Sequence, residues 1–440
     1  MRAADHPEPE GERSGLPTAI EGGPICQSRQ PTWRDLNARS FSPPPARGIA
    51  GWSELGLDSA ALLFFPLLVL VPRGTAALIS AAGVCGAGLL LSSRRSRVSP
   101  ALGFAAALLG CLLLWGTLST LWSVDPMRSV TVAVRLTGLF AVGVVLVAAA
   151  GSIAAPERLT LFLVLGLVFG AGMAWTELMT EGALSSYFSE RVYQPARLNQ
   201  ASISFAILLL PVSAMVVARG HKISGTLLAI AISATVYVLA GTAAKAALIA
   251  GLPIALLLYR GGPAVARAAA VISIFTIVTA PLSFARLERL PALTESADSV
   301  KLSAGHRLLI WSFAGDRIAE RPLTGWGLDS SRAIPGGEGL IRPGEIWLPL
   351  HPHNAPLQLW LELGVPGAVL FALIVALAWW VLTNAPWPPL FFAAAGGSLT
   401  TAFVGCFATY GIWQEWWLGT LWFSLFLVSV IAQRERRLQL

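Results

Sequence analysis

ALGFAAALLGCLLLWGTLSTLW, the stretch from Ala101 to Trp122, runs for 22 residues without a charged side chain. A helix of about twenty apolar residues is long enough to cross the hydrocarbon core of a bilayer. This stretch therefore predicts a membrane-spanning helix and decides the fold class. The composition agrees: 55% of the 440 residues are hydrophobic and only 12% are charged, whereas a soluble domain carries roughly 25% charged residues.

Other stretches of the same character predict about twelve spanning helices and an all-α integral membrane protein. They lie near residues 57–72, 75–92, 101–122, 130–150, 159–178, 201–218, 225–241, 244–259, 268–282, 355–383, 389–409 and 415–432. One large hydrophilic loop separates the ninth helix from the tenth, and we expect short amphipathic helices within it. The predicted regions are a cytoplasmic tail, nine helices, a periplasmic loop, three helices and a basic cytoplasmic tail, with bounds 1–56, 57–282, 283–354, 355–432 and 433–440.

The N-terminal region, residues 1–56, is rich in Pro, Gly and Arg and contains no apolar run. The segment from Ser42 to Arg47 reads SPPPAR, and proline at this density is incompatible with a helix or a central strand. We expect a disordered tail without a cleavable signal peptide.

Basic residues in short loops predict the orientation, because Lys and Arg accumulate on the cytoplasmic side of a membrane. With the N-terminus inside, the inner loops and the C-terminal tail carry Arg94, Arg95, Arg97, Arg158, Arg219, Lys222, Arg260, Arg267, Arg434, Arg436 and Arg437. The short outer loops carry only Arg73, Arg128, Arg191, Arg197 and Lys245. Both termini are therefore expected in the cytoplasm and the large loop in the periplasm. The formal charge of +7 fits this topology, and we expect no nucleic-acid partner.

The large loop, residues 283–354, contains eight basic and eight acidic residues, so any anion site in it depends on particular arginines. Its residues 306–320 predict an amphipathic helix whose apolar face consists of Ile310, Phe313, Ala314 and Ile318. Such a helix either lies on the bilayer or the helix bundle, or also directs Arg307 toward a membrane-bound phosphate.

His351 and His353 stand in the sequence HPHN, directly before the tenth predicted helix. Imidazoles at the mouth of a helix can bind a metal, act as an acid or base, or only decorate the surface. A metal site is disfavoured, because His306 is the only other histidine in the large loop.

Three basic residues near the outer ends of helices are further candidates. Arg197 stands at the entrance of a span, where it either extends to the lipid headgroups or binds an anion. Arg135 lies about five residues inside the fourth predicted span, and an ionisable group at that depth faces the bundle or a water-filled cavity. Lys245 is a weaker candidate.

The stretch from Gly305 to Gly367 resembles the signature domain of the O-antigen ligase and O-antigen polymerase superfamily. The matching residues are Arg307, Trp311, the sequence PLTGWG with Gly325 and Gly327, and then His353, Asn354, Gln358, Glu362, Gly364 and Gly367. Upstream, LWSVDP at 121–126 is similar to the family's first outer loop, and Arg197 and Lys245 fall where the family carries basic residues. One departure is Thr242-Ala243-Ala244, where the family often has Ser-x-Ser, and it leaves a role for Lys245 in doubt.

The resemblance implies a multi-pass protein of the bacterial inner membrane with its active site facing the periplasm. It implies a metal-independent, inverting glycosyltransferase of GT-C-like type, without a cofactor, that takes a glycan from undecaprenyl diphosphate. The acceptor is a hydroxyl of the lipid A core, of a second lipid-linked glycan or of a protein. By this resemblance Arg197 and Arg307, with Lys245 as the weaker candidate, bind the diphosphate, and Arg135 is added to them for its depth in the fourth predicted span. His353 activates the acceptor, with His351 as the second candidate, and Trp311, Gly325, Gly327 and Asn354 are structural.

The sequence leaves the acceptor open. The HPHN…LQLWLELG stretch is most similar to polymerase-type members, so we favour a polymerase of exopolysaccharide or O-antigen over a ligase that completes lipopolysaccharide. A polysaccharide transporter with twelve helices is the alternative from a different class, but it predicts internal repeats and ionisable residues near mid-bilayer. Membrane lipids are expected partners, and flippase and chain-length regulator proteins are further candidates.

Overall fold

Apolar helices make up most of the described chain, because a segment in hydrocarbon must satisfy its backbone N–H and C=O groups internally. The computed structural model describes residues 48–93, 99–187, 193–293, 302–342, 344–407 and 410–439. Its long apolar helices are α2 (Ile49–Leu70), α3 (Gly74–Ser92), α4 (Pro100–Leu118), α5 (Pro126–Ala149), α6 (Pro156–Met179), α8 (Asn199–Val217), α9 (Lys222–Val238), α10 (Thr242–Val278), α14 (Ala355–Asn384), α15 (Pro389–Gly405) and α16 (Glu415–Gln439). The predicted all-α fold class is confirmed.

Nine helices among the described residues are long and apolar enough to cross a membrane. They are α2, α3, α4 with η1 (Ser119–Leu121), α5 with η2 (Ala150–Ser152), α6, α8 with η3 (Pro195–Leu198), α10, α14 and α16. The apolar helices α9 and α15 have 17 residues each, one fewer than the 18 residues required of a candidate span. The chain is a multi-pass membrane protein, and the number twelve stays a prediction.

The element α10, with 37 residues, contains the predicted span 244–259 and the first part of the predicted span 268–282, up to Val278. Its backbone leaves helical geometry at Gly262, where φ is 55° and ψ is −140°, and Pro263 follows. A residue without Cβ tolerates this conformation, and proline cannot continue a helical hydrogen-bond ladder. The element therefore consists of two helices joined at a kink, in the place where the sequence predicts a short loop.

The first helix begins earlier than its apolar run. It starts at Ile49, inside the predicted N-terminal tail, whose residues 1–47 lie outside the described part of the chain. Glu54 accepts a hydrogen bond from the backbone N–H of Ala154 and pairs with Arg158 at 3.0 Å. These contacts fix two turns of helix that hydropathy alone assigns to the tail, so the predicted boundary at residue 56 is corrected.

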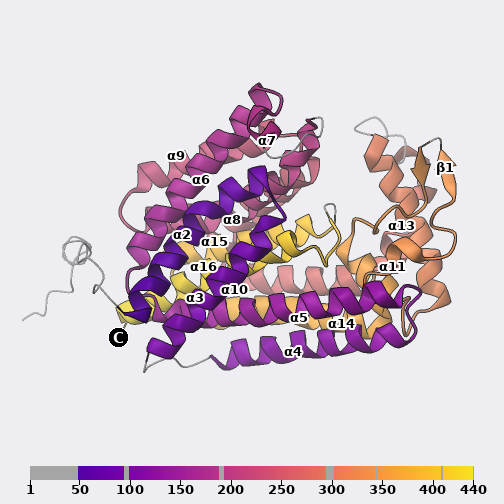
Figure 1. Cartoon of the computed structure of the whole chain (residues 1–440), viewed down its shortest axis with the longest axis horizontal. Helices are drawn as coiled ribbons and strands as arrows, with labels where there is room; N and C mark the ends of the chain where they lie inside the picture. The colour runs from indigo at the N-terminus through magenta and orange to yellow at the C-terminus, as the bar shows by residue number, and fades with distance from the viewer. Residues whose placement is uncertain are drawn as a thin grey trace, which may run out of the picture. The chain divides into compact units, whose positions relative to one another are not determined.

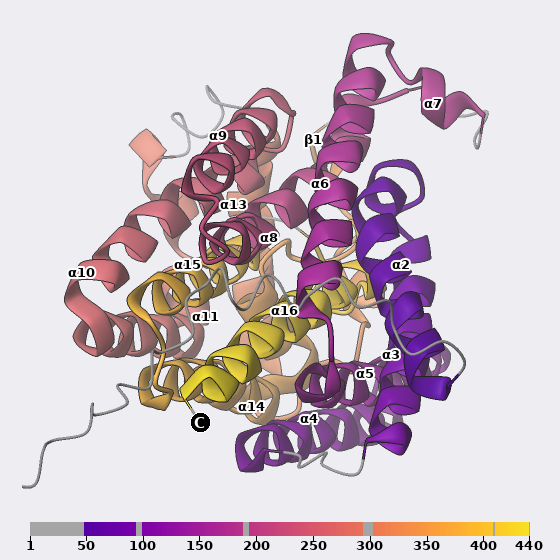
Figure 2. The ribbon, with the colours of Figure 1, turned by 90° about the vertical axis from the view of Figure 1, so that its left-hand side faces the viewer.

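Helix α16 occupies the middle of the bundle, with α2, α3 and α5 on one side of it and α10 and α15 on the other (Figure 2). It contacts α3, α5 and α8. Aromatic rings fill the contacts: Phe423 of α16 stacks on Phe64 of α2 with ring centroids 4.3 Å apart, and Phe65 stacks on Phe205 of α8 at 5.4 Å. The ends of α16 and α8 consequently form parts of both ends of the bundle.

The segment between α10 and α14 gathers at one end of the bundle (Figure 1). It contains α11 (Ala280–Ser283), η4 (Leu287–Arg289), α13 (Leu302–Glu320), η5 (Ser331–Ala333) and the antiparallel strands β1 (Leu340–Arg342) and β2 (Glu345–Ile346). The loop after α6 adds the short helix α7 (Ala183–Ser186). The predicted amphipathic helix is confirmed, since the apolar face of α13 is buried against Trp326 and against Leu357 of α14. That face packs on protein.

Candidate active site

Helix α14 is broken at Gly364, where φ is 63° and ψ is −157°. The next residue, Val365, donates its backbone N–H at 2.9 Å to the first residue of the glycine turn, which we define as residues 322–327. In an unbroken helix this N–H would bind the carbonyl of Leu361. Pro366 has no N–H, so it leaves the next carbonyl of the helix without a partner as well. Two carbonyl groups of α14 are therefore available to another segment.

The glycine turn supplies the missing donors. The N–H of Trp326 donates to the carbonyl of Leu361 at 2.9 Å, and the N–H of Gly327 donates to that of Glu362 at 2.8 Å. Gly325 and Gly327 have φ values of 66° and 110°. A Cβ atom at Gly325 would lie 2.4 Å from the carbonyl of Glu362. Glycine is thus required by conformation and by close approach, which gives both glycines the structural place predicted for them.

The loop that resembles the family's first outer loop meets the same turn. Val124 donates its N–H to the carbonyl of Trp326 at 3.1 Å, and the indole of Trp122 donates to the carbonyl of Thr324 at 3.2 Å. Two stretches about 200 residues apart are therefore joined.

Directly after the glycine turn, Asp329 and Arg332 line a cavity of about 720 Å³. Its other lining residues are Arg73, Arg128, Val132, Arg135, Leu136, Gln200, Leu350, His351, His353, Tyr410, Gly411, Trp413, Gln414, Glu415 and Trp416. These residues come from the ends of α5, α8 and α16 and from the loops between helices. We call it the arginine-lined cavity.

The charges around this cavity are unequal, with four arginines and two carboxylates. Arg128 pairs with Asp329 at 2.5 Å, and Arg135 pairs with Glu415. Burial raises the pKa of Asp329, and the charge of Arg128 opposes that rise. Within the part of the chain that the structure describes, the Nε of Arg332 is buried without a hydrogen-bond partner. An excess of positive charge and an unused donor are suited to an anionic ligand.

The two histidines have different surroundings. His351 is buried, and its Nδ1 and Nε2 face the backbone N–H groups of His353 at 3.2 Å and Gly411 at 3.0 Å. A neutral imidazole has one acceptor nitrogen, so it can accept only one of these two bonds. Burial, followed by the electrostatic interactions with His353, Arg332 and Arg307, holds the pKa of His351 well below its ordinary value. His353 is less buried and lines the cavity in a left-handed conformation, with φ of 56°.

Arg307 is adjacent to the cavity without lining it. Its charge acts on Tyr410 and His351, which are both lining residues. Burial lowers the pKa of Arg307 and raises that of Tyr410, whose pKa the nearby guanidinium lowers in turn. The guanidinium thus contributes to the potential inside the cavity.

Of the four basic residues predicted at the diphosphate, only Arg135 lines the cavity. Arg197 lies in η3, three residues before the lining residue Gln200. Lys245 lies near the start of α10, with its ammonium group 5.2 Å from the ring centre of Tyr237. The structure therefore does not bring these residues together in one pocket.

Trp311 and Asn354 hold the histidine segment in place. The indole of Trp311 donates to the carbonyl of Pro352 at 2.8 Å. The side chain of Asn354 caps α14 by accepting the N–H of Leu357 at 3.1 Å. Both contacts fix the chain on either side of His353.

The loop between α15 and α16 supplies Tyr410 and Trp413, and the start of α16 supplies Glu415; none of these was expected at the site from the sequence. Its signal is a group of aromatic and polar residues, YGIWQEWW, between two apolar runs. Interface tryptophans have the same composition, so the pattern alone does not indicate a site. Among the described residues there is also no group of three or more His, Cys, Asp or Glu side chains arranged to hold a metal ion.

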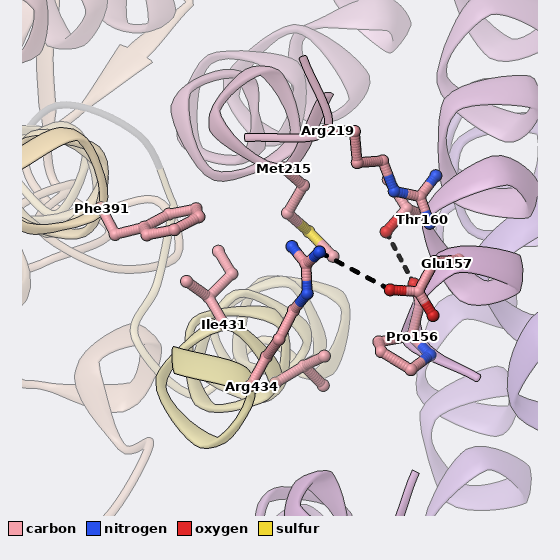
Figure 3. Close-up of a pocket in the computed structure, with 9 residues that line it drawn as sticks. Pro156, Glu157, Thr160, Met215, Arg219, Phe391, Ile431 and Arg434 are labelled. Atoms are coloured by element: carbon pink, nitrogen blue, oxygen red, sulfur yellow. Dashed lines mark hydrogen bonds and ion pairs between the residues drawn. The ribbon is translucent and has the colours of Figure 1, made fainter. Parts of the chain in front are cut away.

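A second pocket lies at the other ends of α8 and α16, where Arg219, Arg434 and Glu157 meet (Figure 3). Arg434 is nineteen residues after Glu415 of the arginine-lined cavity, which is about 28 Å along a helix and close to the thickness of a bilayer core. Arg434 pairs with Glu157 at 3.6 Å. This pocket has a volume of about 10 Å³, room for one water molecule, and so is too small for a substrate.

Residues 227–372 match the protein family described as O-Antigen ligase. This stretch of the chain is similar to the O-antigen ligase family. Proteins named as polysaccharide ligases in Rickettsia conorii and Rickettsia felis are 35% and 34% identical to it over 147 residues, and one in Rickettsia bellii is 34% identical over 137 residues. The Rickettsia conorii match covers 32% of this chain and 36% of the relative, so the chain spans about a third of the length of the curated relatives it matches. No solved structure matches the chain significantly.

The matched stretch begins in α9 and ends in α14. It includes the glycine turn, Arg307, Arg332 and both cavity histidines. The parts of the cavity wall that come from α5 and from residues 410–416 lie outside the matched stretch. The predicted resemblance to the O-antigen ligase superfamily is confirmed.

Proposed function

We propose that this chain is a glycosyltransferase of the bacterial inner membrane that moves a glycan from undecaprenyl diphosphate to a hydroxyl group at the periplasmic face. The arginine-lined cavity carries this proposal. It combines an excess of positive charge, an unpartnered arginine nitrogen and a histidine beside the O-antigen ligase signature.

In the proposed reaction the acceptor oxygen forms a bond to the anomeric carbon, and the bond from that carbon to the diphosphate breaks. The leaving diphosphate keeps the electron pair, so its negative charge grows in the transition state. Guanidinium groups stabilise that charge by charge-assisted, bidentate hydrogen bonds. Arg307 and Arg332 are assigned to the diphosphate, with Arg135 at the same cavity. Arg307 is included because its charge acts on the lining residues His351 and Tyr410. Arg197 and Lys245, which do not line the cavity either, remain weaker assignments.

The acceptor proton passes to His353 in this mechanism. His351 is less suited to the role, because both of its ring nitrogens face backbone N–H groups and it is only 4% exposed. A backside attack by the hydroxyl inverts the anomeric centre and requires no metal. Activity that is lost in EDTA and restored by Mg²⁺ would contradict this mechanism.

Of the three acceptors compatible with this chemistry, two are each favoured by an observation. The sequence favours a second lipid-linked glycan, which makes the protein a polymerase of exopolysaccharide or O-antigen. The names of the Rickettsia relatives favour a ligase that joins the glycan to the lipid A core. In a deletion strain, glycans of a single repeat would indicate a lost polymerase, whereas long chains detached from lipid A would indicate a lost ligase.

The experiment that tests the proposed function is turnover of an undecaprenyl-diphosphate-linked glycan by the full chain in nanodiscs. We expect release of undecaprenyl diphosphate, and a decrease of at least about tenfold in Arg332→Gln, since a charge-assisted bond is lost. Arg317→Gln is the matched control, because Arg317 belongs to the same segment and pairs with Glu320 outside the cavity. Movement of intact lipid-linked glycan without cleavage would instead support a transporter.

A further inference from the structure

One buried carboxylate lies next to the arginine-lined cavity without lining it. The side chain of Glu362 is fully buried and accepts four hydrogen bonds. The donors are the backbone N–H of Asp329 at 2.8 Å, the Nε2 of Gln358 at 3.0 Å, the indole of Trp413 at 2.5 Å and the hydroxyl of Ser331. A charged residue inside a spanning helix is costly and marks a functional region by default.

Gln358 and Glu362 are four residues apart, so they lie on the same face of α14. Gln358 uses its other end as well: its Oε1 accepts the N–H of Ile412 at 2.9 Å. The orientation of the Gln358 amide is therefore defined. Its oxygen accepts from the loop before α16, and its nitrogen donates to the Glu362 carboxylate. Each donor and acceptor of the pair is matched.

Two of the four donors, Asp329 and Trp413, line the cavity and come from separate segments of the chain. Asp329 has a left-handed backbone, with φ of 51°, and its carboxylate pairs with Arg128. Ser331 precedes Arg332, and Trp413 is itself a lining residue. Segments more than 80 residues apart in the sequence therefore meet on one side chain.

We propose that Glu362 is a positioning residue: it fixes Asp329 and Trp413, and through them the two walls between which the substrate diphosphate is held. The inference rests on the proposed function, because the diphosphate is part of it. The polarity of the bonds at both oxygens requires a carboxylate, because the Oε1 of Glu362 faces the amide nitrogen of Gln358, whose own oxygen is held by Ile412. The Oε2 of Glu362 faces the N–H groups of Asp329 and Trp413, and neither of these can reverse to accept a hydrogen bond.

The substitution Glu362→Gln tests this polarity with almost no change in volume. Its amide nitrogen has to face the Ser331 and Gln358 side, where Ser331 can rotate to accept it. Gln358 cannot accept it without turning its amide, and that turn breaks its bond to Ile412. We expect Glu362→Gln to lower kcat/KM for glycan transfer by about tenfold to a hundredfold, with a weaker affinity for farnesyl diphosphate as a soluble lipid diphosphate probe.

The double variant Q358E/E362Q should restore both kcat/KM and the affinity for farnesyl diphosphate. A carboxylate at 358 accepts the N–H of Ile412 and the new amide, while the carbonyl oxygen at 362 still accepts from Asp329 and Trp413. We expect kcat/KM and probe affinity within about threefold of the original chain, since all bonds are again matched. Glu177→Gln is the control for a buried carboxylate elsewhere, because Glu177 is 2% exposed and binds only the N–H of Ser185 among the described hydrogen bonds. Glu177→Gln should change neither kcat/KM nor the probe affinity.

The outcomes separate the inference from the proposed function. If the original chain neither binds the probe nor transfers glycan, the proposed function is wrong. If the original chain is active, normal activity of Glu362→Gln overturns the inference, as does a folded Q358E/E362Q that stays inactive. Should Glu362→Gln fail to fold, recovery of folding and activity in Q358E/E362Q still supports matched polarity, and failure of both variants overturns it.

Discussion

Arg307 is a single guanidinium whose charge reaches the cavity through Tyr410 and His351. If it binds the diphosphate by a bidentate contact, lysine cannot replace it, because an ammonium group lacks the planar fork. We predict that Arg307→Lys is nearly as damaging as Arg307→Ala, each costing about 2–4 kcal/mol in the transition state. The measurement is kcat/KM for glycan transfer in nanodiscs. Turnover of Arg307→Lys near that of the unmodified chain would exclude bidentate recognition.

The histidines should not be interchangeable. His353 lines the cavity, whereas His351 has both nitrogens directed at backbone N–H groups. We predict that His353→Ala abolishes transfer, a loss of about 10²–10⁴ in rate, and leaves expression and probe affinity largely unchanged. His351→Ala should be milder in rate. An inactive His351→Ala together with an active His353→Ala would reverse the assignment, and activity in both would exclude a histidine base.

His351 also makes stability depend on pH. Its pKa in the folded chain is well below the ordinary value, so the unfolded chain binds the proton first. The stabilisation is complete above the unfolded pKa of about 6.5 and is lost as the pH falls below it. We predict that Tm decreases more steeply between about pH 7 and pH 5 in the original chain than in His351→Gln. Equal slopes would show that His351 does not contribute to acid destabilisation.

The break in α14 is the element that determines the position of the glycine turn. At Gly364 a Cβ atom would lie 2.5 Å from the carbonyl oxygen of Leu323, and φ is positive. We predict that Gly364→Ala lowers the free energy of unfolding by at least about 2 kcal/mol, measured by thermal unfolding in detergent. Gly138→Ala in α5 is the control, because a Cβ there meets nothing within 4 Å. A loss no larger than that of the control would contradict the role of the break.

Hydropathy predicts the helices of this protein well, because a spanning helix depends only on length and apolar composition. It fails where polar contacts extend an element, as at Ile49, where Glu54 and Arg158 lengthen α2. The kink at Gly262 falls where the sequence predicts a loop, because glycine before proline ends both a helix and a ladder of hydrogen bonds. Local rules therefore place the ends of helices, and tertiary contacts adjust them.

Less of the candidate site could be predicted. The family signature points to His353, Arg307 and the glycines, because these residues stand close together in one stretch of the sequence. It did not identify Arg332 as a cavity residue or Trp413 as a partner of Glu362, since these depend on how distant segments meet. A single sequence contains no information on such pairs.

The orientation of the whole molecule rests on its basic residues. If the excess of Lys and Arg in the inner loops gives the right orientation, Glu338 faces the periplasm and His221 faces the cytoplasm. Both residues are exposed. We predict that Glu338→Cys, in a chain whose four native cysteines are replaced by serine, reacts with an impermeant thiol reagent on cells with a permeabilised outer membrane. His221→Cys should react only after the inner membrane is opened. Equal labelling of both would overturn the orientation.

The backbone bonds between the glycine turn and α14 have a consequence for cooperativity. The amide protons of Trp326, Gly327 and Val365 are held by bonds that join a surface segment to a spanning helix. Such protons exchange with deuterium only when the structural unit containing them opens. The turn should therefore exchange as slowly as α14 and much more slowly than a surface loop. The rim of the cavity would then open only together with α14. The free energy of opening the candidate site would therefore equal that of opening the helix.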